Sequence, residues 1–198
     1  MAGIYTDVDR LILDRWDEVS DLLAAREELQ DRIAETIEAA GQKLERALEP
    51  RGYLVESQAK DGEFHVYRSS WNDRRRGPSV YFTLGAFCPR GYRKVVEPHP
   101  YLWLMTETLA NFRVKDEERR SLAAAIRRAL GAAAESWDHE DCYDDAPVGR
   151  SLTRIGNRQR AENISSPSRL YDFALAELEA AFEIAAIVER CVEKHLAR

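Results

Sequence analysis

The stretch GYLVESQAKDGEFHVYRS, residues 52–69, predicts a β-hairpin and thereby decides the fold class. Its two halves, 52–58 and 63–69, contain β-branched and aromatic residues and flank a turn with Asp61 and Gly62. An Asp-Gly pair between two such segments is a strong signal for a tight hairpin turn. The hairpin therefore favours an antiparallel sheet.

Two further strand-like segments follow the hairpin without a helix between them. SVYFTLGAF, residues 79–87, predicts a third strand, and YLWLMTET, residues 101–108, predicts a fourth after the turn residues EPHP. The alternative for residues 101–108 is the start of a helix that continues into LANF. Strands that follow one another in this way indicate an antiparallel meander.

Helical segments flank this sheet region. Residues 7–49 carry apolar residues at spacings of three and four, and Pro50 ends the pattern. A helix of that length spans roughly 60 Å at about 1.5 Å per residue, more than a compact domain of this size covers. Part of the helix must therefore project, bend or pack on another element.

Two more helices are predicted in the second half of the chain. Residues 115–137 form one helix with acids in its first turn, and residues 166–198 form another, with Ser166 as cap and Pro167 at its first position. The apolar face of this last helix is rich in alanine, so another helix can approach it closely. The N-terminal helix is the expected partner, either within one chain as a helical hairpin or across a two-fold axis.

These patterns predict an α+β protein with a small antiparallel sheet of about four strands covered by helices. The expected parts are an N-terminal helix over 1–50 for assembly or docking, a core over 51–165, and a C-terminal helix over 166–198. The residues expected at the assembly interface lie on the apolar faces of the two terminal helices: Ile12, Trp16, Leu23, Ile33, Ile37, Leu44, Leu178, Phe182, Ile184 and Val188.

Composition narrows the class of protein. The 198 residues fit one domain, and 44% hydrophobic residues are enough for a core. Three cysteines at unrelated spacings indicate neither a disulfide framework nor a zinc site. The N-terminus has no apolar segment typical of a secretory signal, and charges interrupt every apolar run before a membrane-spanning length. We therefore expect a cytoplasmic protein in a reducing environment.

The net charge of −6 hides a strong asymmetry. Residues 7–49 contain 13 acids and 6 bases, whereas residues 68–94 contain 7 bases and only Asp73 as an acid. Residues 150–169 contain 5 bases and 1 acid. The candidate contact residues are basic and aromatic side chains of these middle segments: Trp71, Arg74, Arg75, Arg76, Tyr92, Arg93, Lys94, Arg150, Arg154, Arg158 and Arg160.

Three interpretations of this basic set remain open. Arginines can grip phosphates while aromatic rings stack on bases, which would make the set a nucleic-acid surface. The same arginines can instead meet acidic helices of a protein partner. The third interpretation is a solvated loop without a partner. The acidic Asp73 beside the arginine triplet, and the overall pI of about 5.4, favour a protein partner over phosphate.

No catalytic signature is found in the chain. It lacks Gly-x-Ser-x-Gly and a glycine-rich phosphate loop. The acidic segment 138–145 offers ligand types for a metal, but its spacing fits neither a calcium loop nor a zinc pattern, so a solvated loop is the simpler interpretation. We expect no metal and no cofactor.

The order of the segments resembles one known superfamily. A helix ending in LEPRGYLVES, the hairpin strand leading to EFHVYRSSW, the strand VYFTLGAF and the later APVGRSLTR together look like small bacterial proteins of the PD-(D/E)XK nuclease superfamily. The resemblance covers roughly residues 45 to 195. It implies a nuclease-like fold and a place in a bacterial defence or toxin-control complex.

The catalytic motif of that superfamily does not transfer to this chain. The motif needs an acid two residues before a lysine, so that carboxylates bind Mg²⁺ and the lysine steadies the phosphate. The residues two before the five lysines are Gly41, Gln58, Tyr92, Arg113 and Val192. We therefore expect a non-catalytic binding or regulatory protein that associates with itself or with a larger complex. The alternative is a nucleic-acid-binding or degenerate nuclease-like module.

Overall fold

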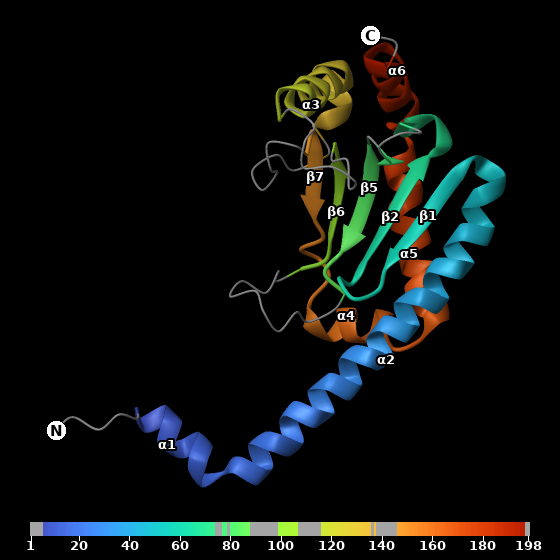
Figure 1. Ribbon diagram of the computed structural model, residues 1–198. Coiled ribbons are helices and arrows are strands. Elements are labelled where there is room, and N and C mark those ends of the chain that lie inside the picture. Colours follow the sequence, from blue (N-terminus) through green and yellow to red (C-terminus); the bar gives the residue numbers. More distant parts are fainter. Residues whose placement is uncertain are drawn as a thin grey trace.

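The computed structural model describes residues 6–73, 77–78, 80–87, 99–106, 116–135, 137 and 146–196. Its centre is a five-stranded antiparallel sheet, and a long N-terminal helix packs on this sheet and on a C-terminal helix (Figure 1). The described helices are α1 (Asp7–Asp14), α2 (Trp16–Leu48), α3 (Asp116–Leu130), α4 (Asn157–Asn163), α5 (Pro167–Phe182) and α6 (Ala185–Leu196). The fold class is α+β, as the sequence predicted.

The strand order of the sheet is β1-β2-β5-β6-β7. The strands are β1 (Tyr53–Gln58), β2 (Glu63–Arg68), β5 (Tyr81–Gly85), β6 (Tyr101–Met105) and β7 (Val148–Ser151), and each pair of neighbours is antiparallel. A separate two-stranded pair joins β3 (Asn72–Asp73) to β4 (Gly77–Pro78). The first four strands of the large sheet lie in the segments that the sequence assigned to strands.

The fifth strand corrects the expectation of about four. β7 lies in a stretch to which the sequence pattern assigned no strand, because VGRS is short and carries no alternation of large apolar residues. Its pairing partner explains its conformation: Val148 lies opposite Leu104, and Gly149 lies opposite Trp103. A Cβ atom on Gly149 would come within 2.3 Å of the Trp103 ring, so only glycine lets the two strands approach here.

One face of the sheet forms the main core with the long helices. Phe64, Val66, Phe82, Leu84, Leu102 and Leu104 alternate along β2, β5 and β6 and are all fully buried. Phe182 of α5 stacks on Tyr53 with ring centroids 4.1 Å apart, and Phe173 of α5 meets Phe87 edge to face. Helix α5 therefore covers this face, and α2 packs beside it against β1.

Gly41 lets α2 approach the sheet. A Cβ atom there would lie 1.7 Å from the Ser57 hydroxyl oxygen of β1, which is impossible without a shift. The helix ends at Leu48, and a short 3₁₀ turn η1 (Glu49–Arg51) leads to Gly52, whose φ of 80° requires the left-handed region that glycine adopts readily. The expected stop at Pro50 is confirmed within this turn.

The N-terminal helix is not continuous. Arg15, with φ −122° and ψ 35°, separates α1 from α2, and Figure 1 shows α1 set at an angle to α2. Beyond this bend, the first half of α2 projects away from the body of the molecule (Figure 1). The projection agrees with the length argument, because the buried residues of α2 all lie between Ile33 and Leu48.

The C-terminal helix is also divided. Ser166 accepts a hydrogen bond from the Arg169 amide and Pro167 starts α5, so the predicted cap is confirmed. Glu183 and Ile184 interrupt the predicted single helix and separate α5 from α6. Helix α6 packs against α3 and against the 3₁₀ turn η2 (Ser69–Trp71). The 3₁₀ turn η3 (Gly131–Ala134) follows α3 in the chain.

None of the helices in the described part of the chain is both long enough and apolar enough to cross a membrane.

Candidate association surface

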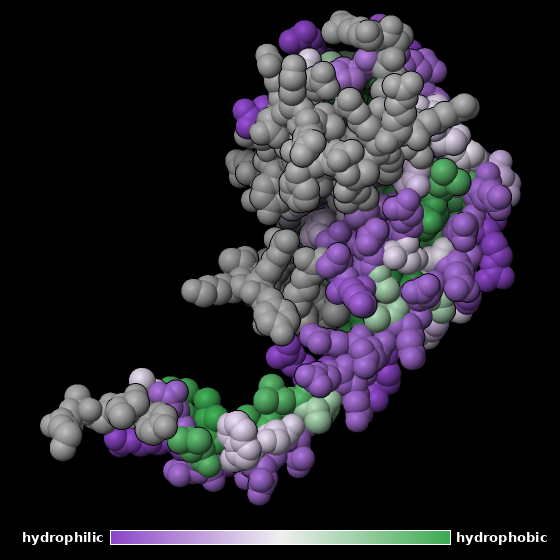
Figure 2. Space-filling model, in the orientation of Figure 1, coloured by the Kyte–Doolittle hydropathy of each residue, from purple (hydrophilic) through white to green (hydrophobic). Residues whose placement is uncertain are grey.

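The most unusual surface of the molecule is an N-terminal arm, which we define as α1 and the α2 residues up to Leu29. Its large apolar side chains are exposed and are not covered by the other residues that the structure describes. Eight large apolar side chains of the arm are 37–71% exposed, and we call them its apolar stripe: Val8, Leu11, Ile12, Leu13, Trp16, Leu22, Leu23 and Leu29. Figure 2 shows apolar side chains gathered on the inner side of the bend between α1 and α2.

The start of the arm is defined by local hydrogen bonds. Thr6 and Asp9 form a capping box, in which the Asp9 amide donates to the Thr6 hydroxyl and the Thr6 amide donates to the Asp9 carboxylate at 2.7 Å. The Thr6 hydroxyl also donates to the Asp9 carboxylate at 2.7 Å, and this bond, followed by the bond from the Thr6 amide, lowers the pKa of Asp9 because both stabilise its charged form. A helix of eight residues without tertiary packing depends strongly on such a cap.

The arm is acidic around its apolar stripe. Residues 7–28 contain eight acids and three bases, a net charge of −5. Two exposed ion pairs, Arg15 with Glu18 and Arg32 with Glu28, lie along the helix surface and contribute little to stability. An apolar stripe with an acidic border suits a partner surface that is apolar in the middle and basic at its edge.

The structure divides the residues expected at the assembly interface. Ile12, Trp16 and Leu23 are exposed on the arm at 37%, 57% and 49%. The others are covered mainly by the chain itself: Ile33, Ile37, Leu44, Leu178, Ile184 and Val188 are at most 4% exposed, and Phe182 packs on the core, although Ile33 also lines a groove at the surface. The reason is that α2 and α5 pair within one chain, which is the helical-hairpin alternative, and that α6 packs on α3 and η2.

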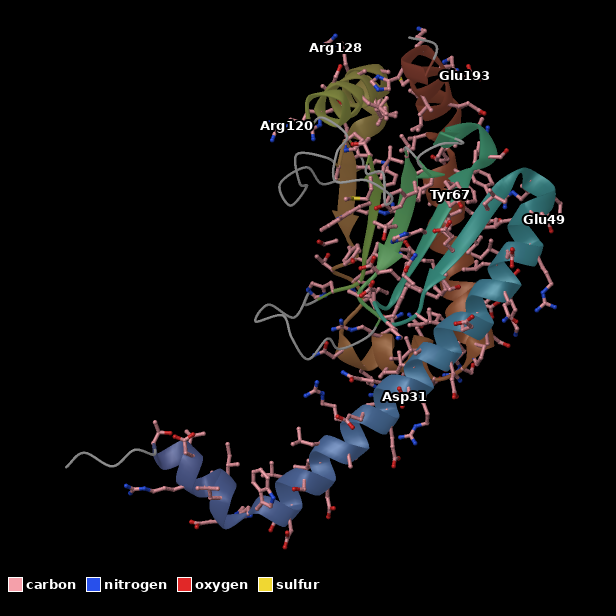
Figure 3. The ribbon with its side chains drawn as sticks, viewed as in Figure 1. Asp31, Glu49, Tyr67, Arg120, Arg128 and Glu193 are labelled. Carbon is pink, nitrogen blue, oxygen red and sulfur yellow. The ribbon has the colours of Figure 1, made fainter. Side chains whose placement is uncertain are left out.

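A groove lies where the arm joins the body. It has a volume of about 840 Å³ and is bordered by α2, α4, the start of α5 and Phe87. Its lining is largely apolar and includes Leu29 of the arm and Ile33, Ala161, Ile164 and Pro167 of the body. In Figure 3 the labelled Asp31 marks this part of α2. The groove is therefore continuous with the exposed stripe of the arm.

The basic residues of 150–160 are largely engaged with the protein itself. Arg150 and Arg154 both donate to the carboxylate of Glu177, which is buried on α5, and the Arg150 guanidinium also lies 5.3 Å from the centre of the Trp137 ring. Arg158 pairs with Glu162 on the surface of α4. Arg150 and Arg154 thus tie β7 and the turn after it to α5, a role that sequence reasoning missed.

Arg160 lies at the edge of the groove. It donates to the backbone oxygen of Ala86 at 3.1 Å and to the side-chain oxygen of Asn157 at 2.5 Å. Burial lowers the pKa of this guanidinium, although an arginine stays charged in practice. The positive charge of Arg160 therefore borders the groove together with Arg32.

Trp71 cannot act as the expected stacking platform. Its ring is fully buried and lies 5.7 Å from Phe82, centre to centre, at an angle of 58°. The hydrophobic free energy of burying a large aromatic ring explains this position better than a surface role does. The remaining members of the predicted basic set, Arg74–Arg76 and Tyr92–Lys94, lie outside the described residues.

The second face of the sheet carries a polar network that the sequence did not single out. Glu63 accepts a hydrogen bond from the Tyr101 hydroxyl at 2.6 Å and lies 3.2 Å from the His65 ring. Tyr67 donates to Glu56 at 2.6 Å, and burial together with this carboxylate raises the pKa of Tyr67. Alternation of polar residues along 56–67 is the signal that could have revealed this face. Figure 3 labels Tyr67 on the sheet.

The described residues contain no cluster of side chains suited to a metal ion. In that part of the chain no three His, Cys, Asp or Glu side chains lie close enough to hold a metal ion. The acidic segment 138–145 lies outside it.

Comparisons of the chain with protein-family models, with curated proteins and with solved structures gave no match.

Proposed function

We propose that this protein acts by binding rather than by catalysis and that its N-terminal arm is the surface of self-association. One observation carries the proposal: eight large apolar side chains stay 37–71% exposed on a helix that projects from the body. Single exposed apolar residues are ordinary, whereas a contiguous stripe of them marks an interaction site. The nuclease-superfamily resemblance and a role in a defence or toxin-control complex remain predictions.

Self-association would remove the apolar stripe of the arm from water. Each leucine that becomes buried contributes on the order of 1 kcal/mol when about half of its surface leaves water. In a dimer each arm buries its apolar stripe on the other copy, so this contribution is gained twice. A helix without tertiary contacts is otherwise marginal in water, so association would also stabilise the arm as a helix.

The test is sedimentation equilibrium of the protein and of two matched variants. Leu22→Glu places a charge on the stripe, and we expect it to weaken association at least tenfold, equivalent to about 1.4 kcal/mol. Ala24→Glu adds the same charge on the same helix about 200° around the axis, and it should associate as the original protein does. Both positions are exposed, so neither change disturbs the core.

Equal association of the Leu22→Glu and Ala24→Glu variants would contradict the proposal. A protein that remains a monomer up to about 100 μM would contradict it as well.

A further inference from the structure

We infer that the groove at the base of the arm is the receptor for helix α1 of a second copy of this chain. Two copies would then exchange arms reciprocally, each α1 seated in the groove of the other. The inference rests on the proposed self-association and adds the site, the occupant and the orientation.

The groove and α1 match in length and in character. The wall that α2 contributes runs from Leu29 to Ala39, which is about 15 Å at the helical rise. Helix α1 has eight residues and is therefore about 12 Å long. Val8, Leu11 and Ile12 of α1 are exposed by 65%, 57% and 37%, and the apolar lining of the groove offers them a place out of water.

Charge determines the orientation of the two copies. Helix α1 carries three aspartates and one arginine, and the arm as a whole carries −5 over residues 7–28. Two such arms side by side in a parallel arrangement would place like charges together. The groove is bordered by Arg32 and Arg160, with Glu35 as its acid, whereas Arg150, Arg154 and Arg158 are paired with Glu177 and Glu162 and add no charge to the groove. In an antiparallel exchange, the acidic helix α1 of one copy therefore lies in the groove of the other, beside Arg32 and Arg160.

The position of the most exposed leucine agrees with a two-fold axis. If two α2 segments cross antiparallel with the two-fold axis near residue 22, Arg15 of one copy, where the chain bends into α1, lies beside Leu29 of the other, where the groove begins. Leu22 is 71% exposed, the highest value among the large apolar residues described. The bend at Arg15 directs α1 away from the α2 axis, so α1 can enter the groove while the two α2 segments lie together (Figure 1).

The surface is large enough for a stable dimer. Eight exposed apolar residues of the arm and thirteen residues that line the groove, with Leu29 common to both, make twenty residues on each copy. Stable protein interfaces use roughly 20–30 residues a side. The arm together with the groove reaches that size.

The experiment compares two tryptophan substitutions on α4. Ala161→Trp fills the groove from an exposed position, and Gln159→Trp adds the same bulk on the same helix at a position that does not line the groove. We expect sedimentation equilibrium to show association weakened at least tenfold by Ala161→Trp and unchanged by Gln159→Trp. Thermal unfolding followed by circular dichroism establishes that both variants fold. Arg32→Glu, with Arg46→Glu as its control, is a second test at exposed positions of α2.

A mixing experiment tests the reciprocal exchange itself. Leu11→Glu places a charge on α1, the tip of the arm, and leaves the groove unchanged. Ala161→Trp fills the groove and leaves the tip unchanged. A mixture of the two variants keeps one intact tip-and-groove contact in each mixed dimer and none in either pure dimer. Native mass spectrometry should therefore find mixed dimers well above the share of about half that random pairing gives.

The outcomes separate this inference from the proposed function. If Ala161→Trp and Arg32→Glu both associate as their controls do while Leu22→Glu does not, the arm associates but the groove is not its receptor, and the inference is wrong. Random pairing in the mixture also overturns it. A monomeric original protein would overturn the inference and the proposed function together.

Discussion

At the scale of single residues, Thr6 and Asp9 decide whether the tip of the arm is helical. The Asp9 carboxylate accepts from the Thr6 amide and hydroxyl, and its pKa lies below the ordinary value of 3.8. A lowered carboxylate pKa means that the cap stabilises α1 fully above the ordinary pKa and that this contribution is lost as the pH falls through the lowered value. Acid should therefore unwind the tip first.

NMR titration of the Asp9 carboxyl carbon tests this prediction. We expect a midpoint below 3.8 in the original protein and a return toward 3.8 in Thr6→Ala, because the hydroxyl bond is lost. Thr6→Ser keeps the hydroxyl and should keep the low midpoint. The same midpoint in the Ala and Ser variants would show that the capping box does not form.

Residues whose roles are local could be predicted from the sequence. Asp61-Gly62 and Ser166-Pro167 act within a few residues of the chain, and both the hairpin turn and the helix cap are confirmed. The role of Glu177 could not be predicted in this way, because its partners Arg150 and Arg154 lie 27 and 23 residues earlier. The burial of Trp71, which was expected on the surface, could not be predicted either, because no local pattern distinguishes a buried ring from an exposed one.

At the scale of elements, the approach of α2 to β1 depends on a single glycine. Ala is the better helix former by about 1 kcal/mol, so Gly41→Ala would stabilise an isolated α2. In the folded chain the added methyl group meets the Ser57 hydroxyl, and we expect a net loss of about 1–3 kcal/mol in the free energy of unfolding.

A second substitution makes this prediction specific. Ser57→Ala removes the oxygen that would lie 1.7 Å from the new methyl group and leaves the Ser57 Cβ position 3.1 Å away. Chemical denaturation should therefore show that the double variant recovers a large part of the stability lost in Gly41→Ala. Simple addition of the two single effects would mean that α2 and β1 are not packed as described.

Element boundaries were the least predictable part of the fold. The apolar spacing continues through Arg15 and through Glu183, so periodicity gave one helix where the structure has two at each end of the chain. Strand β7 was missed because β6 imposes its conformation, and its own four residues do not specify it. Patterns within a segment predicted the type of most elements, whereas the ends of an element depend on contacts distant in sequence.

At the scale of the whole molecule, charge is segregated between the acidic arm and the basic middle of the chain. The nucleic-acid alternative depends on Arg74, Arg75 and Arg76, which lie outside the described residues. If they contact phosphates, replacing all three by Ala should reduce the slope of log affinity against log salt by up to about 2.7 on duplex DNA.

Fluorescence anisotropy with duplex and single-stranded oligonucleotides at about 50 and 200 mM salt measures that slope. We expect no sub-micromolar binding that depends on the three arginines, because the described arginines of the predicted set are engaged with the protein itself. Salt-sensitive binding that the triple variant loses would make nucleic acid the partner instead.

The central claim of self-association through the arm can be measured directly at Trp16. The four tryptophans of the chain are all described, and Trp16 is 57% exposed whereas Trp71, Trp103 and Trp137 are at most 8% exposed. Acrylamide quenching of tryptophan fluorescence therefore reports mainly on the arm, with Trp16→Phe as the background. We predict that Trp16 is protected at about 100 μM protein and becomes accessible on dilution and in Leu22→Glu. Equal quenching of Trp16 at every protein concentration, and in both proteins, would contradict the claim.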